Sequence, residues 1–172
     1  MSVHEHQKHA RSNLRVGVIT ASDTRTEDSD TSGLTVRELL EKAGHQVIYY
    51  EILPDLPEKI SDAIAANLPT LDAIIVNGGT GIAPRDSTIE AVRPMLNKEI
   101  EGFGELFRML SYQEIGSAAF LSRAVAGVAS GKFVAALPGS TAACKLAMEK
   151  LIIPELGHIA YLLDPAARAV TK

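Results

Sequence analysis

Short runs of apolar residues alternate with amphipathic segments along most of the chain. The β-branched and apolar runs at 14–20, 46–53 and 72–77 predict three strands. Apolar residues recur at helical spacing after the polar loop 21–33 and again from about Pro57, which predicts two intervening helices. The run at 72–77 is apolar throughout its middle, as expected for a strand covered on both faces. This alternation with short links predicts a parallel sheet with right-handed crossovers.

The second half of the chain begins with a short helix. Ser87 and Glu90 form an S-x-x-E pattern, which predicts a capping box with Ile89 and Val92 facing inward. Pro94 is expected to end or bend this helix.

Three further elements follow. Apolar spacing over 103–110 predicts a helix, and 122–139 contains two β-type runs separated by "ASGK". The two runs predict a hairpin that adds an antiparallel edge to the parallel sheet. A last helical region is expected after 137–140, with a bend or restart at Pro154.

Composition favours one α/β domain. The chain has 172 residues, 46% of them hydrophobic and 22% charged, with four Phe, four Tyr and no Trp. An aliphatic core of this kind favours α/β layers over a β-sandwich, and this length suits a single domain. We expect a flexible polar tail at 1–12 and one domain over 13–172.

Charge and cysteine usage restrict the partners and the compartment. The net charge is −4 and no basic run is present, which argues against a nucleic-acid partner. Cys144 is the only cysteine, so no intrachain disulfide can form, and its setting among alanines predicts a buried thiol. The polar N-terminus contains no apolar signal core, and no run is long enough for a membrane span. These features predict a soluble cytoplasmic protein.

A glycine cluster follows the third predicted strand. Its backbone N–H groups and the Thr80 hydroxyl can face an anion at the carboxyl end of the sheet. No lysine follows as in a P-loop, and Pro84 stands where a dinucleotide fingerprint has its third glycine. Tight turns also use glycine for steric reasons alone. The candidate phosphate-binding residues are Gly78, Gly79, Thr80 and Gly81.

Two aspartates are candidates for a metal site beside this turn. Asp86 follows the glycines and Asp55 follows the second predicted strand, so both belong to the same end of the sheet. A carboxylate 4 Å from a phosphate is repelled by about 1 to 4 kcal/mol, whereas Mg²⁺ is commonly held by one or two carboxylates together with substrate phosphates. Support of helix capping is an equally good interpretation of Asp86 alone.

The turn at 137–140, "LPGS", repeats the arrangement. Gly139 turns the chain, and Ser140 can cap the next helix or offer its N–H and hydroxyl to a ligand. Taken alone, this pattern is typical of an ordinary strand–helix turn.

The motifs together resemble the MoaB/MogA/gephyrin G-domain family. The matching segments are "TASDTR" (20–25), "DxSG" (30–33), "LPD" (53–55), "NGGTGIAPRDSTIEAV" (77–92), "GFGELFR" (102–108), "LSRAVAG" (121–127) and "ALPGSTAACKLAMEKLIIPELGHI" (136–159). The resemblance implies a three-layer αβα fold and a homotrimer or homohexamer. It also implies Mg-ATP-dependent adenylylation of molybdopterin with release of pyrophosphate.

The resemblance also assigns roles to residues of this chain. Asp55 and Asp86 align with the two required aspartates, which we expect to organise Mg²⁺. The turn residues 78–81 and 139–140 align with the nucleotide-phosphate site. Adenylyltransferase relatives often carry "PGNP" or "PGQP" where this chain has "PGST", so an oligomeric pterin- or nucleotide-binding protein without catalysis is the alternative function. Further candidates for a pterin or phosphate pocket are Ser22, Asp23, Ser122 and Arg123, and Arg123 has an alternative interpretation as a subunit-contact or surface residue.

Overall fold

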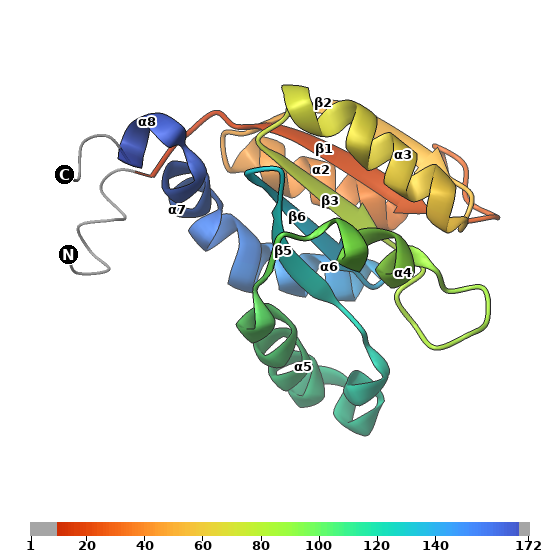
Figure 1. Cartoon of the computed structure of the whole chain (residues 1–172). Helices are drawn as coiled ribbons and strands as arrows, with labels where there is room; N and C mark the ends of the chain where they lie inside the picture. The colour runs from red at the N-terminus through yellow and green to blue at the C-terminus, as the bar shows by residue number, and fades with distance from the viewer. Residues whose placement is uncertain (1–9, 169–172) are drawn as a thin grey trace.

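A mixed sheet of six strands forms the centre of the protein (Figure 1), and residues 10–168 are described by the computed structural model. The strand order is β2-β1-β3-β6-β5-β4, parallel from β2 to β6 and antiparallel beyond it. The strands are β1 Arg15–Ala21, β2 Gln46–Leu53, β3 Ala73–Asn77, β4 Lys98–Glu99, β5 Val125–Ala129 and β6 Lys132–Leu137.

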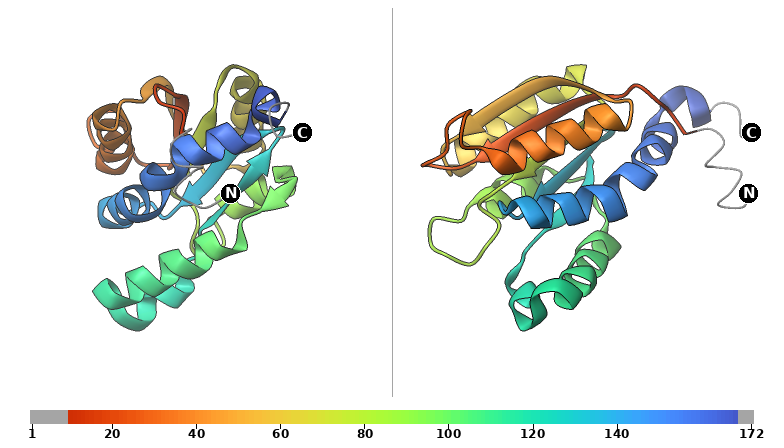
Figure 2. Two further views of the ribbon diagram at one scale, coloured as in Figure 1. Left: turned by 90° about the vertical axis from the view of Figure 1, so that its left-hand side faces the viewer. Right: turned by 180° about the vertical axis from the view of Figure 1, so that it is seen from behind.

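Helices cover both faces of the sheet (Figure 2). Side chains from α2, α5, α6 and α7 share one apolar cluster with the sheet, and those from α3 and α4 share the other. The predicted three-layer αβα architecture is therefore confirmed. The helices are α2 Thr31–Lys42, α3 Pro57–Asn67, α4 Thr88–Val92, α5 Glu101–Ile115, α6 Thr141–Ala147, α7 Ile153–Leu163 and α8 Pro165–Arg168, with 3₁₀ segments at Leu68–Thr70, Arg93–Met95 and Gly116–Leu121.

Alternation along the strands divides the core between the two faces. In β3, Ala73 and Ile75 point to the α2 side and Ile74 and Val76 to the α3 side, and all four are fully buried. The prediction that this strand is covered on both faces is confirmed. Burial of Ile74, Ile75 and Val76 contributes about 1.5 to 3 kcal/mol each relative to exposed side chains, so β3 is a rigid support for the loop that follows it.

The predicted hairpin is present, but a further strand lies outside it. β5 and β6 pair antiparallel, with Val125 opposite Ala136, and β6 pairs parallel with β3. The edge position is occupied by β4, whose two exposed residues pair with β5 through the backbone. The alternation of apolar and polar side chains cannot predict such a strand, because both of its residues are exposed and pair only through the backbone.

Helix ends follow the expected chemistry, with one exception. Asp30 caps α2 by accepting from the Gly33 N–H, and Gly44 ends that region with a φ of +85°. The prediction of a capping box at Ser87 and Glu90 is wrong, because the Ser87 side chain accepts no hydrogen bond from a backbone N–H of α4. Ile89 and Val92 are buried as predicted.

Pro154 changes the last helix, as predicted. A π-helical segment, Met148–Ile152, separates α6 from α7, and Pro154 stands in the first turn of α7. A proline offers no N–H to the preceding turn, and a wider turn accommodates that missing bond.

The described part of the chain begins at residue 10 and ends at residue 168. Most of the predicted tail, residues 1–9, falls outside the described residues, as do residues 169–172. Arg11, at the end of that predicted tail, is already fixed: its N–H donates to Gly157 O at 3.0 Å and its guanidinium lies 3.4 Å from Asp72. Among residues 10–168, no helix is long and apolar enough to cross a bilayer.

Candidate functional site

Two glycine turns meet at the carboxyl ends of β3 and β6. These strands are parallel neighbours, with Asn77 opposite Leu137, so the loops that follow them start side by side. The Gly78 N–H donates to Leu137 O at 3.0 Å, and a Cβ added to Gly139 would lie 3.1 Å from Gly78 Cα. The two predicted phosphate-binding turns therefore form one continuous backbone surface.

The first turn requires glycine. Gly78 has a φ of +96° and an added Cβ would lie 2.2 Å from Ala21 O, while Gly79 has a φ of +60°. The N–H groups of Gly79, Thr80 and Gly81 donate to no acceptor within residues 10–168. Successive free N–H groups beside left-handed backbone form a concavity suited to an anion. We call residues 78–81 the glycine loop.

Asp55 lies against the glycine loop. A Cβ added to Gly79 would lie 2.5 Å from Asp55 Oδ2, so the carboxylate occupies the space beside that glycine. Its other oxygen, Oδ1, accepts from the Ser87 hydroxyl at 2.8 Å and from the Ser87 N–H at 3.2 Å. Ser87 is thus used to hold Asp55, which is why it does not cap α4.

Asp86 lies against the same loop two residues further on. A Cβ added to Gly81 would lie 2.6 Å from Asp86 Oδ2, and that oxygen accepts from the Ala83 N–H at 2.8 Å. The carboxylate therefore stabilises its own loop instead of capping the helix. The structure brings Asp55 and Asp86 to one site, linked through Ser87.

The donor set fits a cation that also binds phosphate. Asp55 Oδ2 and Asp86 Oδ1 accept no hydrogen bond from residues 10–168, so each carboxylate keeps one oxygen available. Within the same residues, no group of three or more His, Cys, Asp or Glu side chains could hold a metal. Two carboxylates completed by phosphate and water are typical of Mg²⁺, which seldom occupies an all-protein cage.

The four further candidates do not share one pocket. Ser22 and Asp23 line a separate hollow of about 480 Å³ near the end of β2, and Asp23 Oδ1 accepts from the Asp55 N–H at 3.1 Å. Ser122 lines a hollow of about 320 Å³ together with the glycine loop. The guanidinium of Arg123 binds groups of the protein itself.

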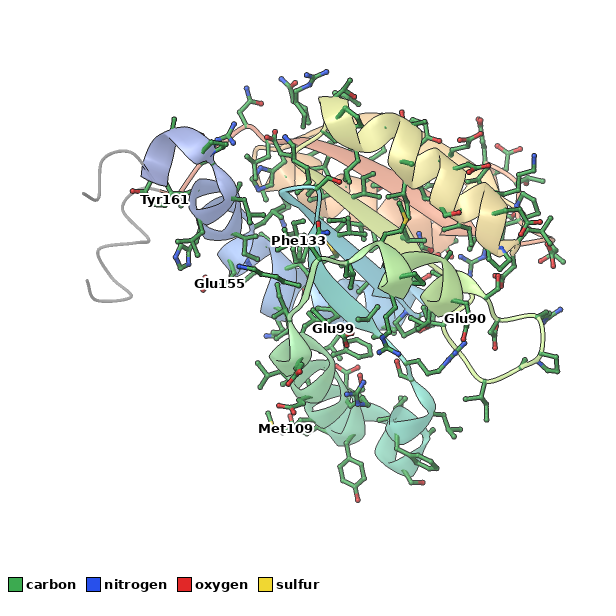
Figure 3. All side chains as sticks on the ribbon, in the orientation of Figure 1. Glu90, Glu99, Met109, Phe133, Glu155 and Tyr161 are labelled. Carbon is green, nitrogen blue, oxygen red and sulfur yellow. The ribbon has the colours of Figure 1, made fainter. Side chains whose placement is uncertain are left out.

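Arg123 braces the loop that carries Asp86. Its Nε donates to Gly81 O at 2.7 Å, and a terminal nitrogen donates to Asp86 O at 3.1 Å. The rest of the guanidinium pairs with Glu90, and this hydrogen bond holds the pKa of Glu90 below its usual value. Figure 3 shows Glu90 beside the loop that follows β3. Arg123 is therefore placed to position the loop.

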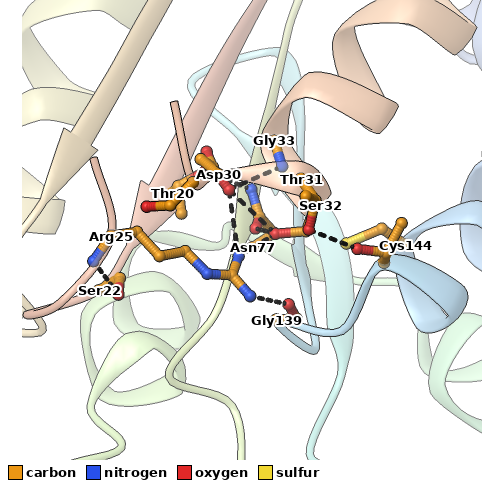
Figure 4. A network of polar contacts seen from close by, with 12 residues as sticks. Thr20, Ser22, Arg25, Asp30, Thr31, Ser32, Gly33, Asn77, Gly139 and Cys144 are labelled. Carbon is orange, nitrogen blue, oxygen red and sulfur yellow. Dashed lines mark hydrogen bonds and ion pairs between the residues drawn. The ribbon is translucent and has the colours of Figure 1, made fainter. Parts of the chain in front are cut away.

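A buried network holds the second turn (Figure 4). Arg25 donates to Gly139 O at 2.7 Å and to Asp30 Oδ1 at 3.1 Å, and it also contacts Ser32. Asp30 is fully buried and accepts from the Thr20 hydroxyl at 2.5 Å and the Tyr50 hydroxyl at 2.6 Å.

The charge of Asp30 is stabilised by this network. Burial alone raises the pKa of Asp30, but hydrogen bonds from Thr20, Tyr50, Gly33 and Ser32 outweigh it and the pKa falls below its usual value. Asp30 therefore remains an anion that anchors Arg25. The motifs "TASDTR" and "DxSG" contain these residues, but their spacing does not show that Arg25 reaches a turn 114 residues away.

Two hydroxyl groups near the glycine loop have no hydrogen-bond partner within residues 10–168. Thr88 Oγ1 is buried with no hydrogen bond, and a Cβ added to Gly79 would lie 2.5 Å from it. Ser111, on α5, lines the 320 Å³ hollow and its hydroxyl bonds to none of the described residues. Neither residue is marked by a motif of known chemistry.

Cys144 lies behind the second turn and is buried as predicted. Its Sγ donates to Pro138 O at 3.2 Å. Burial raises the pKa of the thiol to about 12, which keeps it protonated and unreactive.

Comparison with known proteins identifies the family. The family model described as "Probable molybdopterin binding domain" matches residues 17–158. The chain belongs to this family. Its sequence is 56% identical over 162 residues to molybdenum cofactor biosynthesis protein B of Halalkalibacterium halodurans, covering 92% of this chain and 95% of the relative.

Solved structures of the family share the fold. A crystal structure of a molybdenum cofactor biosynthesis protein B is 54% identical, covers 90% of this chain and 98% of its own, and superposes with a TM-score of 0.86. The tungsten cofactor synthesizing protein MoaB from Pyrococcus furiosus is 40% identical, covers 87% and 96%, and has a TM-score of 0.78. The resemblance predicted from the motifs is confirmed.

Proposed function

We propose that the protein acts in molybdenum cofactor biosynthesis by transferring AMP from Mg-ATP to the terminal phosphate of molybdopterin. One observation carries this proposal. Within residues 10–168, the N–H groups of Gly79, Thr80 and Gly81 donate to no acceptor, and the two carboxylates beside them, those of Asp55 and Asp86, each have one oxygen that accepts no hydrogen bond. The family membership supports the pathway, and the site supports the phosphoryl chemistry.

The reaction needs no activated side chain. An oxygen of the acceptor phosphate attacks the α-phosphorus of ATP, the bond from that phosphorus to the bridging oxygen breaks, and pyrophosphate leaves. The N–H groups of Gly79, Thr80 and Gly81 hold phosphate oxygens in line, which lowers the barrier by positioning and charge stabilisation. Asp55 and Asp86 would hold the cation with their open oxygens. Bound Mg²⁺ supplies the positive charge that offsets both the phosphates and the two carboxylates.

The test is product formation by an aspartate variant. Asp86→Asn keeps an oxygen for the Ala83 N–H but loses the charge, so we expect an unchanged fold and turnover reduced by about 100-fold or more. The assay is mass-spectrometric detection of adenylylated molybdopterin with Mg-ATP. Asp62→Asn, on the exposed side of α3, is the matched control and should be fully active. Unchanged turnover in Asp86→Asn would remove its metal role.

A pterin- or nucleotide-binding protein without this activity is the second candidate. The side chains of the "PGST" turn are engaged in the fold: the Ser140 hydroxyl accepts from the Ala143 N–H at 3.2 Å, and the Thr141 hydroxyl pairs with that of Thr31 at 2.9 Å. Calorimetric binding of AMP or molybdopterin by a protein that forms no adenylylated product would favour this candidate.

We also propose a homotrimer or homohexamer in the cytoplasm. The outer side of α5 and the 3₁₀ segment after it carry uncovered apolar side chains, and Phe120 is 74% exposed. Met109 projects outward there (Figure 3), on a helix that extends away from the rest of the fold (Figure 1). Patches of this kind mark protein interfaces. Sedimentation of the purified protein as a monomer would contradict the assembly. The uncovered apolar residues of α5 and this segment are Leu106, Met109, Tyr112, Ile115, Phe120 and Leu121.

A further inference from the structure

Thr88 carries a buried hydroxyl that the fold leaves without a partner. The residue is the first of α4 and is fully buried, and its Oγ1 forms no hydrogen bond within residues 10–168. An unpaired hydroxyl in the interior destabilises the folded state, and valine would fill nearly the same space without that cost. Folding alone therefore gives no reason for a hydroxyl at this position.

The backbone places this hydroxyl against Gly79. The Thr88 N–H donates to Gly79 O at 3.0 Å, so the start of α4 is bound directly to the glycine loop. A Cβ added to Gly79 would lie 2.5 Å from Thr88 Oγ1, 2.5 Å from Asp55 Oδ2 and 2.6 Å from Asp55 Oδ1. The hydroxyl and the carboxylate therefore border the same small space beside Gly79, which a side chain on that residue would fill.

Hydrogen bonds hold the carboxylate of Asp55 through one oxygen only. Oδ1 accepts from the hydroxyl and the N–H of Ser87, whereas Oδ2 accepts no hydrogen bond within residues 10–168. Ser87 directly precedes Thr88, so two neighbouring hydroxyl groups lie beside one carboxylate. A carboxylate oxygen can accept at two sites, so Oδ2 can bind a cation and accept a hydrogen bond at the same time.

The surroundings of the Thr88 hydroxyl restrict what it can bind. Thr88 lines neither the 320 Å³ hollow beside the glycine loop nor the hollow of about 440 Å³ on the outer side of that loop. Its Oγ1 is closed off from solvent. Among the described residues, Asp55 Oδ2 is the open acceptor that borders the same space as this hydroxyl.

A bound cation gives this pair a role. Carboxylates that ligate metals are themselves hydrogen-bonded, and those outer partners fix the orientation of the ligand oxygens. Ser87 already provides such a partner for Oδ1. The hydroxyl of Thr88 lies close to Oδ2 and is bonded to nothing else in the described chain, so it is available as the second partner.

We infer that Thr88 is a positioning residue of the cation site, whose hydroxyl donates to Asp55 Oδ2 when the divalent cation is bound. The inference rests on the proposed function, because it assumes that Asp55 is a ligand of that cation. It adds the group that orients the ligand oxygen, and it explains why a destabilising hydroxyl is present beside the glycine loop.

The experiment measures nucleotide affinity with and without the cation. Dissociation constants of ATP are determined by calorimetry in Mg²⁺ and in EDTA for the native protein and three variants. Thr88→Val lacks the hydroxyl and should weaken binding about 10- to 100-fold in Mg²⁺ while leaving binding in EDTA unchanged. Thr88→Ser retains the hydroxyl and should bind as the native protein does in both solutions. Thr70→Val, at an exposed threonine in the 3₁₀ segment before β3, is the matched control and should also bind as the native protein does.

Denaturation in EDTA separates this role from a structural one. Thr88→Val removes an unpaired hydroxyl, so its denaturation midpoint should be at least that of the native protein. Thr88→Ser removes a buried methyl group, so its midpoint should be lower. The variant that loses Mg²⁺-dependent affinity is then the more stable of the two, and a damaged fold cannot account for that loss.

Three results would overturn the inference. They are native affinity of Thr88→Val in Mg²⁺, equal weakening of this variant in Mg²⁺ and in EDTA, and equal weakening by serine and by valine in Mg²⁺. Equal affinity of the native protein in the two solutions would remove the cation site and this inference with it. Failure of the proposed function has a different result: the native protein forms no adenylylated molybdopterin, while Thr88→Val still weakens ATP binding in Mg²⁺ alone.

Discussion

Replacing Gly79 with alanine tests whether the glycine loop and Asp55 form one unit. The new Cβ would lie 2.5 Å from Asp55 Oδ2 and from Thr88 Oγ1, so the carboxylate has to move. Moving it weakens the two hydrogen bonds from Ser87 to Asp55 Oδ1. The left-handed φ of +60° adds about 1 to 2 kcal/mol of strain for alanine. Hydrogen bonds to a charged group contribute about 1.5 kcal/mol each at the low end, so loss of both bonds together with the strain gives a total of about 4 to 5 kcal/mol.

Gly131 provides the control for backbone strain. Its φ is +75°, and an added Cβ would meet no heavy atom within 4 Å, so Gly131→Ala should lose only about 1 to 2 kcal/mol. Chemical denaturation at one fixed protein concentration measures both variants, and calorimetry measures Mg-ATP binding. We expect Gly79→Ala to be the less stable variant and to lose nucleotide affinity, and Gly131→Ala to keep it. Equal stability losses together with equal affinities would refute the contact between the loop and Asp55.

Three further changes have defined outcomes. Arg123→Ala should lower the free energy of unfolding by about 2 to 3 kcal/mol, because two hydrogen bonds to carbonyls are lost. Glu90→Gln, at a 53% exposed side chain, should lower it by less than about 1 kcal/mol. A double-mutant cycle measured by denaturation checks this, and equal losses in the two variants would contradict the role of Arg123 in holding the loop. Thr88→Val removes a buried hydroxyl without a partner, so the free energy of unfolding should rise by up to about 2 kcal/mol, and a loss above about 1 kcal/mol would reveal a missing partner. Burial lowers the pKa of His45, whose Nδ1 accepts from the Leu14 N–H. The stability contributed by the neutral imidazole is therefore complete above the ordinary pKa of about 6.5 and decreases as the pH falls below it. His45→Asn should reduce the decrease of Tm between pH 7.5 and 5.5, and a decrease identical to that of the native protein would contradict this.

The sheet and the two turns could be predicted because local patterns determine them. Strands such as β3 are continuous apolar runs, and positive φ at Gly78 and Gly79 requires glycine in the sequence itself. The pattern also placed Asp55 and Asp86 at one edge of the sheet, because they follow β2 and β3, two parallel strands of that sheet with β1 between them.

The contacts that hold the site could not be predicted in the same way. The S-x-x-E pattern indicates a capping box, but tertiary partners compete for both side chains: Asp55 binds Ser87 and Arg123 binds Glu90. Arg123, a candidate for a pterin or phosphate pocket, donates hydrogen bonds to two carbonyls of its own protein, which its position in the sequence does not indicate. Which acceptor a long side chain reaches depends on the folded geometry, and no local spacing records it.

The close approach of Gly139 to Gly78 limits how the site can vary. Because the two turns touch through backbone atoms, their separation does not depend on any side chain in either turn. Substitutions at Ser140 and Thr141 can therefore alter which groups surround the cradle while its width stays constant. Under the proposed function, family members with different residues after this glycine are expected to retain phosphate binding and to differ in the reaction that follows it.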